Sequence, residues 1–405
     1  MALINKKTWR TLHLWIALIG GLFIINLSIS GTLLVYAKDI QQWINPDYWL
    51  VEPQSSQLDI ADLLIGVEQQ TQSRVSRLYI EQDPKLSWRM SLMDDRYVSV
   101  NPYTQKILLI YKPEETFYGW LLRWHRWLLL KSSNGDYPLK DLVSVITVFF
   151  MLNLLVGVWL WVKPKNRWKN MKPVVKGKLQ LVLLRWHNLL GVISTLPLLL
   201  IAITGVAFNW HAPIKSALEF LTTSSVETIA QQANLKAAMD KHKADKTSLP
   251  RVLNQKLLSA GSPQQIKRDQ LTHAVMSARS AMPEAELHRI YMPKKTGDVI
   301  RFRMKQPAEP HPYSWLWIDP STSQVVKQFY GDRANLTTRT WNFRYSLHIG
   351  KFFHPSMEVI WSILSLMPSV LTITGVILYL KRRRKRQPSN KKVMAQTLSQ
   401  VTEYR

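Results

Sequence analysis

Two histidines, His13 and His187, stand at the starts of long apolar segments and are followed by the same spacing of small residues. The residues 4, 7, 15 and 18 positions further on are small in both segments; they are Ala17, Gly20, Ser28 and Gly31 in the first and Gly191, Ser194, Ala202 and Gly205 in the second. These steps keep to one face of an α-helix. Each segment is therefore predicted to be a helix with a histidine at one end and a stripe of small residues below it.

A pair of histidines at one depth in a membrane can hold one metal from both sides, and the strongest candidate is a haem iron with two imidazole ligands. The small residues would give a flat macrocycle clearance, although such stripes also let membrane helices pack closely with no cofactor. Without a cofactor, His13 and His187 would be capped or interfacial residues. Ionisable residues inside a membrane are usually functional, which favours the metal site.

Two further histidines, His125 and His348, lie shortly before other apolar segments, in roughly corresponding places of the two halves of the chain. We expect them to form an outer ligand pair, with His211 and His354 as substitutes near the same surface. An aromatic interfacial helix could also hold His125 and His348 for packing alone. Ordinary surface roles are expected for the remaining histidines, which are His242, His273, His288 and His311.

Each of the four candidate ligands has an arginine two to four residues upstream, and these are Arg10, Arg123, Arg185 and Arg344. Haem propionates are carboxylates, which the planar guanidinium group binds through two hydrogen bonds. Arg10 and Arg185 also stand where the positive-inside rule places basic residues. Arg123 and Arg344 lie on the outer side of the membrane, where the positive-inside rule gives no reason for basic residues, so they are stronger evidence for a propionate-binding role.

Four apolar stretches, at about 12–36, 142–162, 189–210 and 357–380, are each long enough to span a bilayer. The fold class is an α-helical integral membrane protein with two long outer loops. The predicted boundaries are an N-terminus and first helix over 1–37, an outer module with an interfacial segment over 38–140, a second helix over 141–162, a basic link over 163–186, a third helix over 187–211, a second outer module over 212–355, a fourth helix over 356–380 and a basic tail over 381–405.

The charge distribution predicts the membrane topology, and the lack of cysteine limits the cofactors that the chain could bind. Basic residues gather before the first helix, in the link and in the tail, which places both termini in the cytoplasm. This signal accounts for much of the formal net charge of +26, so nucleic-acid binding is not needed to explain it. With no cysteine, iron–sulfur clusters, thiolate zinc sites and covalent haem are excluded, and any haem is non-covalent haem b. No nucleotide or flavin motif is present.

The outer loops also contain repeated motifs. Arg77-Leu78-Tyr79-Ile80 resembles Arg289-Ile290-Tyr291-Met292. Asn101-Pro102 likewise resembles Asp319-Pro320, and each of these two dipeptides opens a turn between strand-like runs. The predicted strands are 97–100, 107–110, 315–318 and 325–329, and the predicted helices are 60–72 and 270–281. Each loop is therefore expected to be an α+β module with an antiparallel hairpin core. The second copy is enlarged around 220–265, a polar stretch expected to be partly mobile.

Residues 299–306 alternate between apolar and basic side chains. Ile300, Phe302 and Met304 share one face, and Arg301, Arg303 and Lys305 share the other. This pattern predicts a half-buried strand with a solvated face. The alternative is a basic platform for an anionic ligand or partner.

The apolar segments contain further small residues that are expected at comparable depths in the membrane. They are Ser30-Gly31, Thr204-Gly205, Thr374-Gly375 and Gly157.

These features together resemble the PepSY-associated transmembrane family, which includes iron-regulated inner-membrane proteins and ferric-siderophore reductases of Gram-negative bacteria. The resemblance rests on Arg-x-x-His at 10–13, Arg-Trp-His at 185–187, the Ser/Thr-Gly pairs, Leu-His-x-Gly at 347–350 and the two Asn/Asp-Pro turns. It covers nearly the whole chain. The chain departs from the family pattern at His354, where relatives tend to have a small residue after the paired phenylalanines.

The resemblance implies four membrane helices carrying two periplasmic PepSY-type modules, and two haems, with His13 and His187 holding the inner one and His125 and His348 the outer one. The resulting hypothesis is a conduit that takes electrons from an unidentified cytoplasmic or membrane-borne donor to Fe(III) in a siderophore or other chelate, so that Fe(II) is released. The alternatives are a non-enzymatic membrane protein whose modules bind or restrain a partner, and a component of siderophore or haem uptake.

Overall fold

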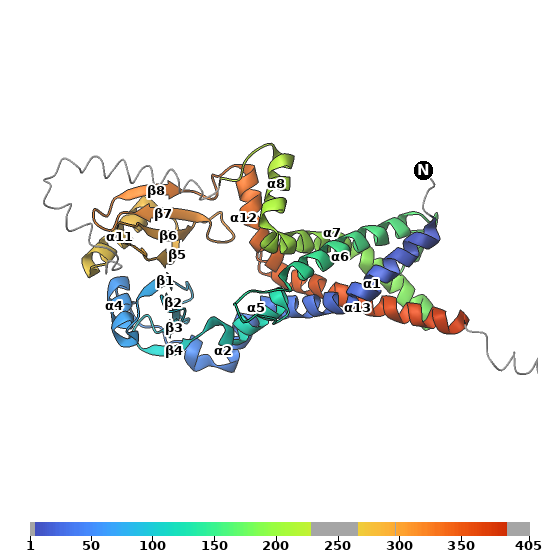
Figure 1. The fold of residues 1–405 in the computed structure, drawn as a ribbon, viewed down its shortest axis with the longest axis horizontal. Coiled ribbons are helices and arrows are strands. Elements are labelled where there is room, and N and C mark those ends of the chain that lie inside the picture. The colour runs from blue at the N-terminus through green and yellow to red at the C-terminus, as the bar shows by residue number, and fades with distance from the viewer. Residues whose placement is uncertain (1–4, 228–265, 296, 387–405) are drawn as a thin grey trace, which may run out of the picture. The chain divides into compact units, whose positions relative to one another are not determined.

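The computed structural model describes residues 5–227, 266–295 and 297–386, which form two compact units (Figure 1). The first, here called the membrane unit, contains the described residues of 5–33, 125–209 and 356–386. The second, here called the sheet unit, contains those of 34–124 and 210–355. Most of the segment predicted to be enlarged, residues 228–265, lies outside the described residues.

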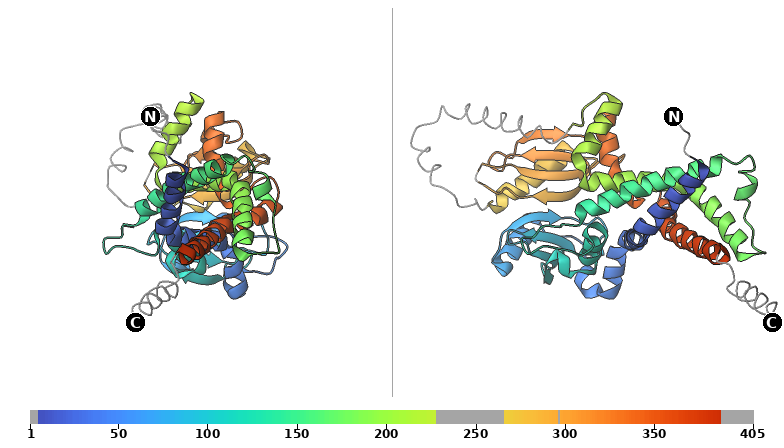
Figure 2. Two further views of the ribbon diagram at one scale, coloured as in Figure 1. Left: turned by 90° about the vertical axis from the view of Figure 1, so that its right-hand side faces the viewer. Right: turned by 45° about the vertical axis from the view of Figure 1, so that its right-hand side comes forward.

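Four helices long and apolar enough to cross a membrane make up most of the membrane unit (Figure 2). They are α1 (Lys6–Val35), α6 (Lys140–Val162), α7 (Leu179–Asn209) and α13 (Ser356–Arg386). The number of spans is as predicted, but all four helices are longer than their apolar stretches. Polar and basic residues continue a helix beyond the bilayer because its backbone hydrogen bonds are internal. Helix α7 begins at Leu179, so the last part of the predicted basic link over 163–186 is helical.

Helix α1 packs against α13 through small and hydroxyl-bearing residues. Ser28 Oγ donates a hydrogen bond to the carbonyl oxygen of Ser365 over 2.6 Å, and the hydroxyl groups of Thr32 and Ser365 lie 2.5 Å apart. A Cβ atom on Gly21 would lie 2.8 Å from Cγ2 of Thr372, so a larger residue here would force the Thr372 side chain to shift. Hydroxyl contacts and close backbone approach are the usual means by which membrane helices associate.

The sheet unit contains one continuous antiparallel sheet of eight strands in the order β4-β3-β2-β1-β5-β6-β7-β8. The strands are β1 (Val75–Tyr79), β2 (Trp88–Leu92), β3 (Tyr97–Val100), β4 (Ile107–Tyr111), β5 (Glu286–Tyr291), β6 (Ile300–Lys305), β7 (Ser314–Ile318) and β8 (Val325–Phe329). Each half is a four-stranded meander preceded by a helix, α4 (Ile60–Thr71) or α11 (Arg268–Ala281). The strands and helices predicted from the turn and strand patterns are confirmed to within a few residues.

The two halves share the sheet, where the sequence predicts two separate modules. Strands β1 and β5 pair antiparallel, with Leu78 opposite Ile290 at the centre of the register and Arg77 opposite Tyr291. Thus the two copies of the Arg-x-Tyr motif pair with each other. This pairing hides one edge of each meander, which would otherwise offer unpaired backbone groups to other chains.

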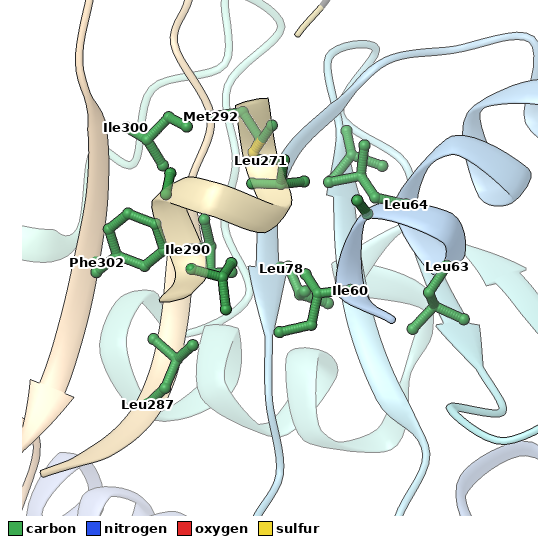
Figure 3. Packing of buried hydrophobic residues seen from close by; sticks show 14 of the residues in the cluster. Ile60, Leu63, Leu64, Leu78, Leu271, Leu287, Ile290, Met292, Ile300 and Phe302 are labelled. Atoms are coloured by element: carbon green, nitrogen blue, oxygen red, sulfur yellow. The ribbon is translucent and has the colours of Figure 1, made fainter. Parts of the chain in front are cut away.

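One face of the sheet and the helices α4 and α11 enclose the hydrophobic core (Figure 3). Leu78, Ile290 and Phe302 from the strands are fully buried, as is Leu63 of α4. Strand β6 alternates as expected, with Ile300, Phe302 and Met304 buried and the intervening basic residues half-buried. The basic side chains therefore lie on the opposite face of the sheet from the helices.

In the described residues, five further α-helices connect the sheet to the long helices. They are α2 (Ala37–Ile44), α3 (Pro46–Trp49), α5 (Phe117–Trp127), α8 (His211–Thr222) and α12 (Leu336–Ile349). Asn335 caps the start of α12 by accepting a hydrogen bond from the backbone NH of Thr338, and Gly350 ends it with a φ of 78°. A left-handed residue at this position favours glycine. Helices α5 and α12 carry the two predicted outer histidines.

Candidate functional site

His13 on α1 and His187 on α7 face each other in the membrane unit. Their ring centroids lie 6.4 Å apart, and the ring planes are nearly perpendicular, at 85°. The two side chains come from segments 174 positions apart in the sequence, so the long helices alone bring them together. The structure therefore confirms the proximity that the repeated helix pattern predicts.

Each of the two rings is held by a hydrogen bond at Nδ1. His13 Nδ1 lies 3.1 Å from the carbonyl oxygen of Asn153 on α6, and His187 Nδ1 lies 2.9 Å from Oγ1 of Thr374 on α13. Thr374 Oγ1 itself donates to the carbonyl oxygen of Val370, so it accepts from the histidine. Both partners act as acceptors, which places the ring hydrogen on Nδ1 and leaves the lone pair on Nε2. Metal-bound histidines are usually oriented in this way by a second hydrogen bond.

The spacing of these rings fits a single metal held between them. Two metal–nitrogen bonds of about 2 Å, with about 1 Å from each nitrogen to its ring centre, require ring centres about 6 Å apart. The observed 6.4 Å agrees with this requirement. In the described part of the chain, no group of three or more His, Asp or Glu side chains could hold a metal ion.

Glycines lie against both rings. A Cβ atom on Gly157 of α6 would stand 3.2 Å from Cε1 of His13, and one on Gly375 of α13 would stand 3.7 Å from Cε1 of His187. Other glycines of the predicted stripe instead contact neighbouring helices, since a Cβ atom on Gly20 or Gly191 would meet Ile146 or Leu371. Part of the small-residue stripe thus serves helix packing.

A third histidine, His125 at the end of α5, is held in the same manner at another level of the membrane unit. Its Nδ1 lies 3.1 Å from Oγ of Ser30, which also donates to the carbonyl oxygen of Asn26. A Cβ atom on Gly31 would stand 2.9 Å from Cε1 of His125. Gly31 follows His13 by 18 residues on one continuous helix, a rise of about 27 Å. The His125 position is thus separated from the His13–His187 pair by nearly the thickness of a bilayer.

The Ser/Thr-Gly pairs are not at comparable depths, as the sequence pattern suggests. Gly157 and Gly375 lie beside His13 and His187, whereas Gly31 lies beside His125 at the other level. The expectation was wrong because α6 and α13 run from the His125 level back to the His13 level. A residue near the end of α1 therefore lies at the opposite end of the bundle from a residue near the end of α6 or α13.

The other candidate outer ligands belong to the sheet unit. His348 is half-buried near the end of α12, His211 is exposed with its ring centroid 5.2 Å from that of Trp341, and His354 is exposed beyond α12. His125 belongs to the membrane unit, so its pairing with His348, or with either substitute, stays a prediction.

The four arginines differ in how they are placed relative to their histidines. Arg10 and Arg344 precede theirs by three and four positions on a helix and share a face with them. Arg123 and Arg185 precede theirs by two, which directs the side chains to different sides. Arg185 donates to the carbonyl oxygen of Lys169, and Arg344 covers the ring of Trp341 at 4.1 Å. Nε of Arg123 is buried without a hydrogen-bond partner in the protein, as a group awaiting an acceptor would be.

Sequence reasoning found the histidines but missed the groups that orient them. Ser30 and Thr374 were noticed only as neighbours of glycines, and Asn153 was not noticed. The contact of His13 is with the backbone carbonyl oxygen of Asn153, which no side-chain pattern encodes; the polar side chain in the middle of the apolar helix α6 is a separate feature. Such residues are costly in a membrane and usually have a partner.

Four membrane-spanning helices with inward-facing histidines, together with a separate antiparallel sheet, define a multi-pass membrane protein. The chain belongs to the family described as the PepSY-associated TM region, which matches residues 10–382. No curated protein sequence matches the chain. The match covers all four membrane helices and the sheet, so the suspected family is confirmed.

Proposed function

We propose that this protein is a transmembrane b-type cytochrome that passes electrons to ferric iron outside the cytoplasm, where it reduces ferric siderophores and so releases their iron. The observation that supports it is the His13–His187 pair, with rings 6.4 Å apart and both Nδ1 atoms hydrogen bonded. A haem iron with two imidazole ligands supplies reversible one-electron transfer.

Some residues would bind the haems, and others would orient the ligand rings. His13 and His187 hold one haem, and Asn153 and Thr374 fix the direction of their rings. His125 would hold a second haem, with Ser30 fixing its ring, and His348 is the histidine that the sequence predicts as its fellow ligand. His211 and His354 remain substitutes for His348. Arg10, Arg185, Arg123 and Arg344 bind the propionates, with the best support for Arg123 because its buried Nε has no partner.

The overall reaction moves one electron across the membrane. A donor on the cytoplasmic side or within the membrane loses the electron, and Fe(III) in a siderophore or other chelate gains it to become Fe(II). Fe(II) binds hard oxygen ligands more weakly, so the chelate releases the metal. The separation of about 27 Å between the levels of His13 and Gly31 matches a carrier at each membrane surface.

The location follows from the charge distribution. The basic residues at the start of α1, between α6 and α7 and at the end of α13 lie at the His13–His187 end of the helices. By the positive-inside rule, this end faces the cytoplasm, and both termini do as well. The sheet unit is then periplasmic, and the membrane is the bacterial inner membrane.

Anaerobic electron transfer from the purified protein tests this function. The haem-loaded protein is reduced with dithionite, freed of excess reductant and mixed with a ferric chelate, while ferrozine traps Fe(II). We expect reoxidation of the haem bands and one Fe(II) formed per electron lost. A haem-loaded protein that stays reduced would contradict the reductase. A protein that binds no haem when haem is supplied would instead favour a non-enzymatic module that binds a partner.

A further inference from the structure

The face of the sheet opposite α4 and α11 alternates basic and aromatic side chains across strands. Along one row of the register, Tyr79 of β1 lies between Arg89 of β2 and Arg289 of β5, and Arg289 is followed by Arg303 of β6 and Trp315 of β7. The next row brings Arg77, Tyr291 and Arg301 side by side. We name these eight residues the cation–aromatic face; they are Arg77, Tyr79, Arg89, Arg289, Tyr291, Arg301, Arg303 and Trp315.

The guanidinium groups of this face lie over the aromatic rings. The Cζ atom of Arg289 is 4.3 Å from the ring centroid of Tyr79, and that of Arg89 is 4.9 Å from the same ring. Arg303 lies 4.8 Å from Trp315 in the same way. Flat cations and flat rings are therefore stacked over the centre of the sheet, an arrangement that holds the guanidinium planes in fixed directions.

Positive charge on this face greatly exceeds negative charge. Arg89 forms an ion pair with Glu81, with Nη2 and Oε1 3.1 Å apart. In the described part of the chain, Arg77, Arg289, Arg301 and Arg303 have no carboxylate within ion-pair distance. Nε of Arg289 is buried and has no hydrogen-bond partner in the protein. Arg289, Arg301 and Arg303 are half-buried, and half-buried cations without counter-charges are costly and are found where an anion completes the site.

Two neighbouring groups respond to this excess charge. Lys38 keeps an exposed side chain, but desolvation of its ammonium group by the surrounding protein, together with the cations of Arg89, Lys351 and Arg289, lowers its pKa to about 8, although Glu81 acts in the opposite direction. Burial and the nearby Arg303 and Arg289 lower the pKa of His311 to about 3. His311, expected to be an ordinary surface residue, thus lies half-buried at the cationic cluster.

We propose that the cation–aromatic face binds an anionic ferric chelate whose oxygen ligands are carried on aromatic rings, the catecholate class. The identification of the ligand as an iron chelate rests on the proposed function; the binding site itself rests on the arrangement of the arginines and rings. Catecholate complexes of Fe(III) are negatively charged and present flat rings at their surface. Arginines bind their oxygen atoms, while the tyrosine, tryptophan and guanidinium planes stack on the rings.

A redox-inert probe tests binding apart from electron transfer. The full-length protein in detergent is titrated with the Ga(III) complex of 2,3-dihydroxybenzoate and, separately, with the cationic Ga(III) complex of a trihydroxamate, and heat is measured by calorimetry. We expect the anionic catecholate to bind at least about 10-fold more tightly, because each charge-assisted hydrogen bond adds affinity. Its affinity should also fall as salt is added.

Substitutions locate the site. Arg289→Gln and the exposed Arg77→Gln should each weaken catecholate binding about 10-fold. Arg279→Gln is the matched control, since Arg279 is exposed on α11 at the opposite face of the sheet, and it should leave the affinity unchanged. Equal affinity for the two gallium complexes would overturn the proposal, and so would unchanged binding by Arg77→Gln and Arg289→Gln.

A haem-ligand variant separates this proposal from the proposed function. His13→Ala should bind the gallium catecholate as the unsubstituted protein does, because the sheet face contains no haem ligand. If the unsubstituted protein binds the gallium catecholate but does not reduce the iron complex, the reductase is contradicted and the binding face is supported. Reduction of ferric chelates without any preference for the anionic catecholate would contradict the binding face alone.

Discussion

Gly31 on α1 lies so close to His125 on α5 that a Cβ atom at position 31 would stand 2.9 Å from Cε1 of the imidazole. The same ring is held at Nδ1 by Ser30. Ser30 and Gly31 of α1 therefore together fix the position of the His125 ring, and any side chain at position 31 must displace that ring.

Gly31→Ala should move His125 and reduce occupancy of the outer haem, with the inner haem retained. Haem content per chain and the reduced α-band measure this effect. Gly20→Ala is the matched control on the same helix, because its Cβ atom would meet Ile146 at an ordinary 3.8 Å. Equal haem content in the two variants would show that His125 is not a ligand.

Thr374→Val should weaken the inner haem site about 10- to 100-fold in affinity, because the acceptor that orients His187 is lost while the side-chain shape is kept. Haem loss to apomyoglobin measures the affinity. Thr195→Val on α7 is the control, since Thr195 bonds only to the carbonyl oxygen of Gly191 one turn earlier. Similar haem loss rates in the two variants would contradict the orienting role of Thr374.

Binding of an anionic catecholate should weaken as the pH rises through about 8. Below that value Lys38 is protonated and adds a positive charge beside Arg89, Arg289 and Lys351; above it the charge is lost, and Glu81 is left with fewer cations around it. Calorimetry with the gallium catecholate between pH 7 and 9 measures this dependence. In Lys38→Met the affinity should be lower at pH 7 and nearly independent of pH over this interval. An unchanged pH profile in that variant would remove Lys38 from the site.

Phe302→Ala should destabilise the sheet unit by about 3–5 kcal/mol, because Phe302 is fully buried between the sheet and its helices. Urea unfolding of the full chain in detergent, followed by tryptophan fluorescence, measures the free energy of unfolding. Phe220→Ala, at a side chain 83% exposed on α8, should change it by less than about 0.5 kcal/mol. Equal effects of the two substitutions would show that the core does not control this transition.

The sequence predicts the elements of this fold better than their partners. Hydrophobic length identifies the four membrane helices, and turn residues such as Pro102 and Pro320 mark the strands on either side. Joining of the meanders through Leu78 and Ile290 depends on a pairing across more than 200 residues, which no local pattern encodes. The sequence therefore indicates two modules where one sheet exists.

The same limit applies to the candidate site. The sequence predicts His13 and His187 as a pair because the same spacing of small residues follows each of them on its own helix. Their hydrogen-bond partners Asn153 and Thr374 lie 140 and 187 positions away on other helices, so only packing of the bundle reveals them. The rows of arginines and rings on the sheet likewise depend on register, which the alternation of a single strand does not supply.

A pyridine-haemochrome assay on the purified full-length protein, after expression with added haem, tests the central claim most directly. The unsubstituted protein and the exposed control His273→Ala on α11 should contain about two b-type haems per chain. His13→Ala should contain about one, because the pair with His187 is broken. A colourless protein, or a haem content that is unchanged in His13→Ala, would contradict the bis-imidazole site between α1 and α7.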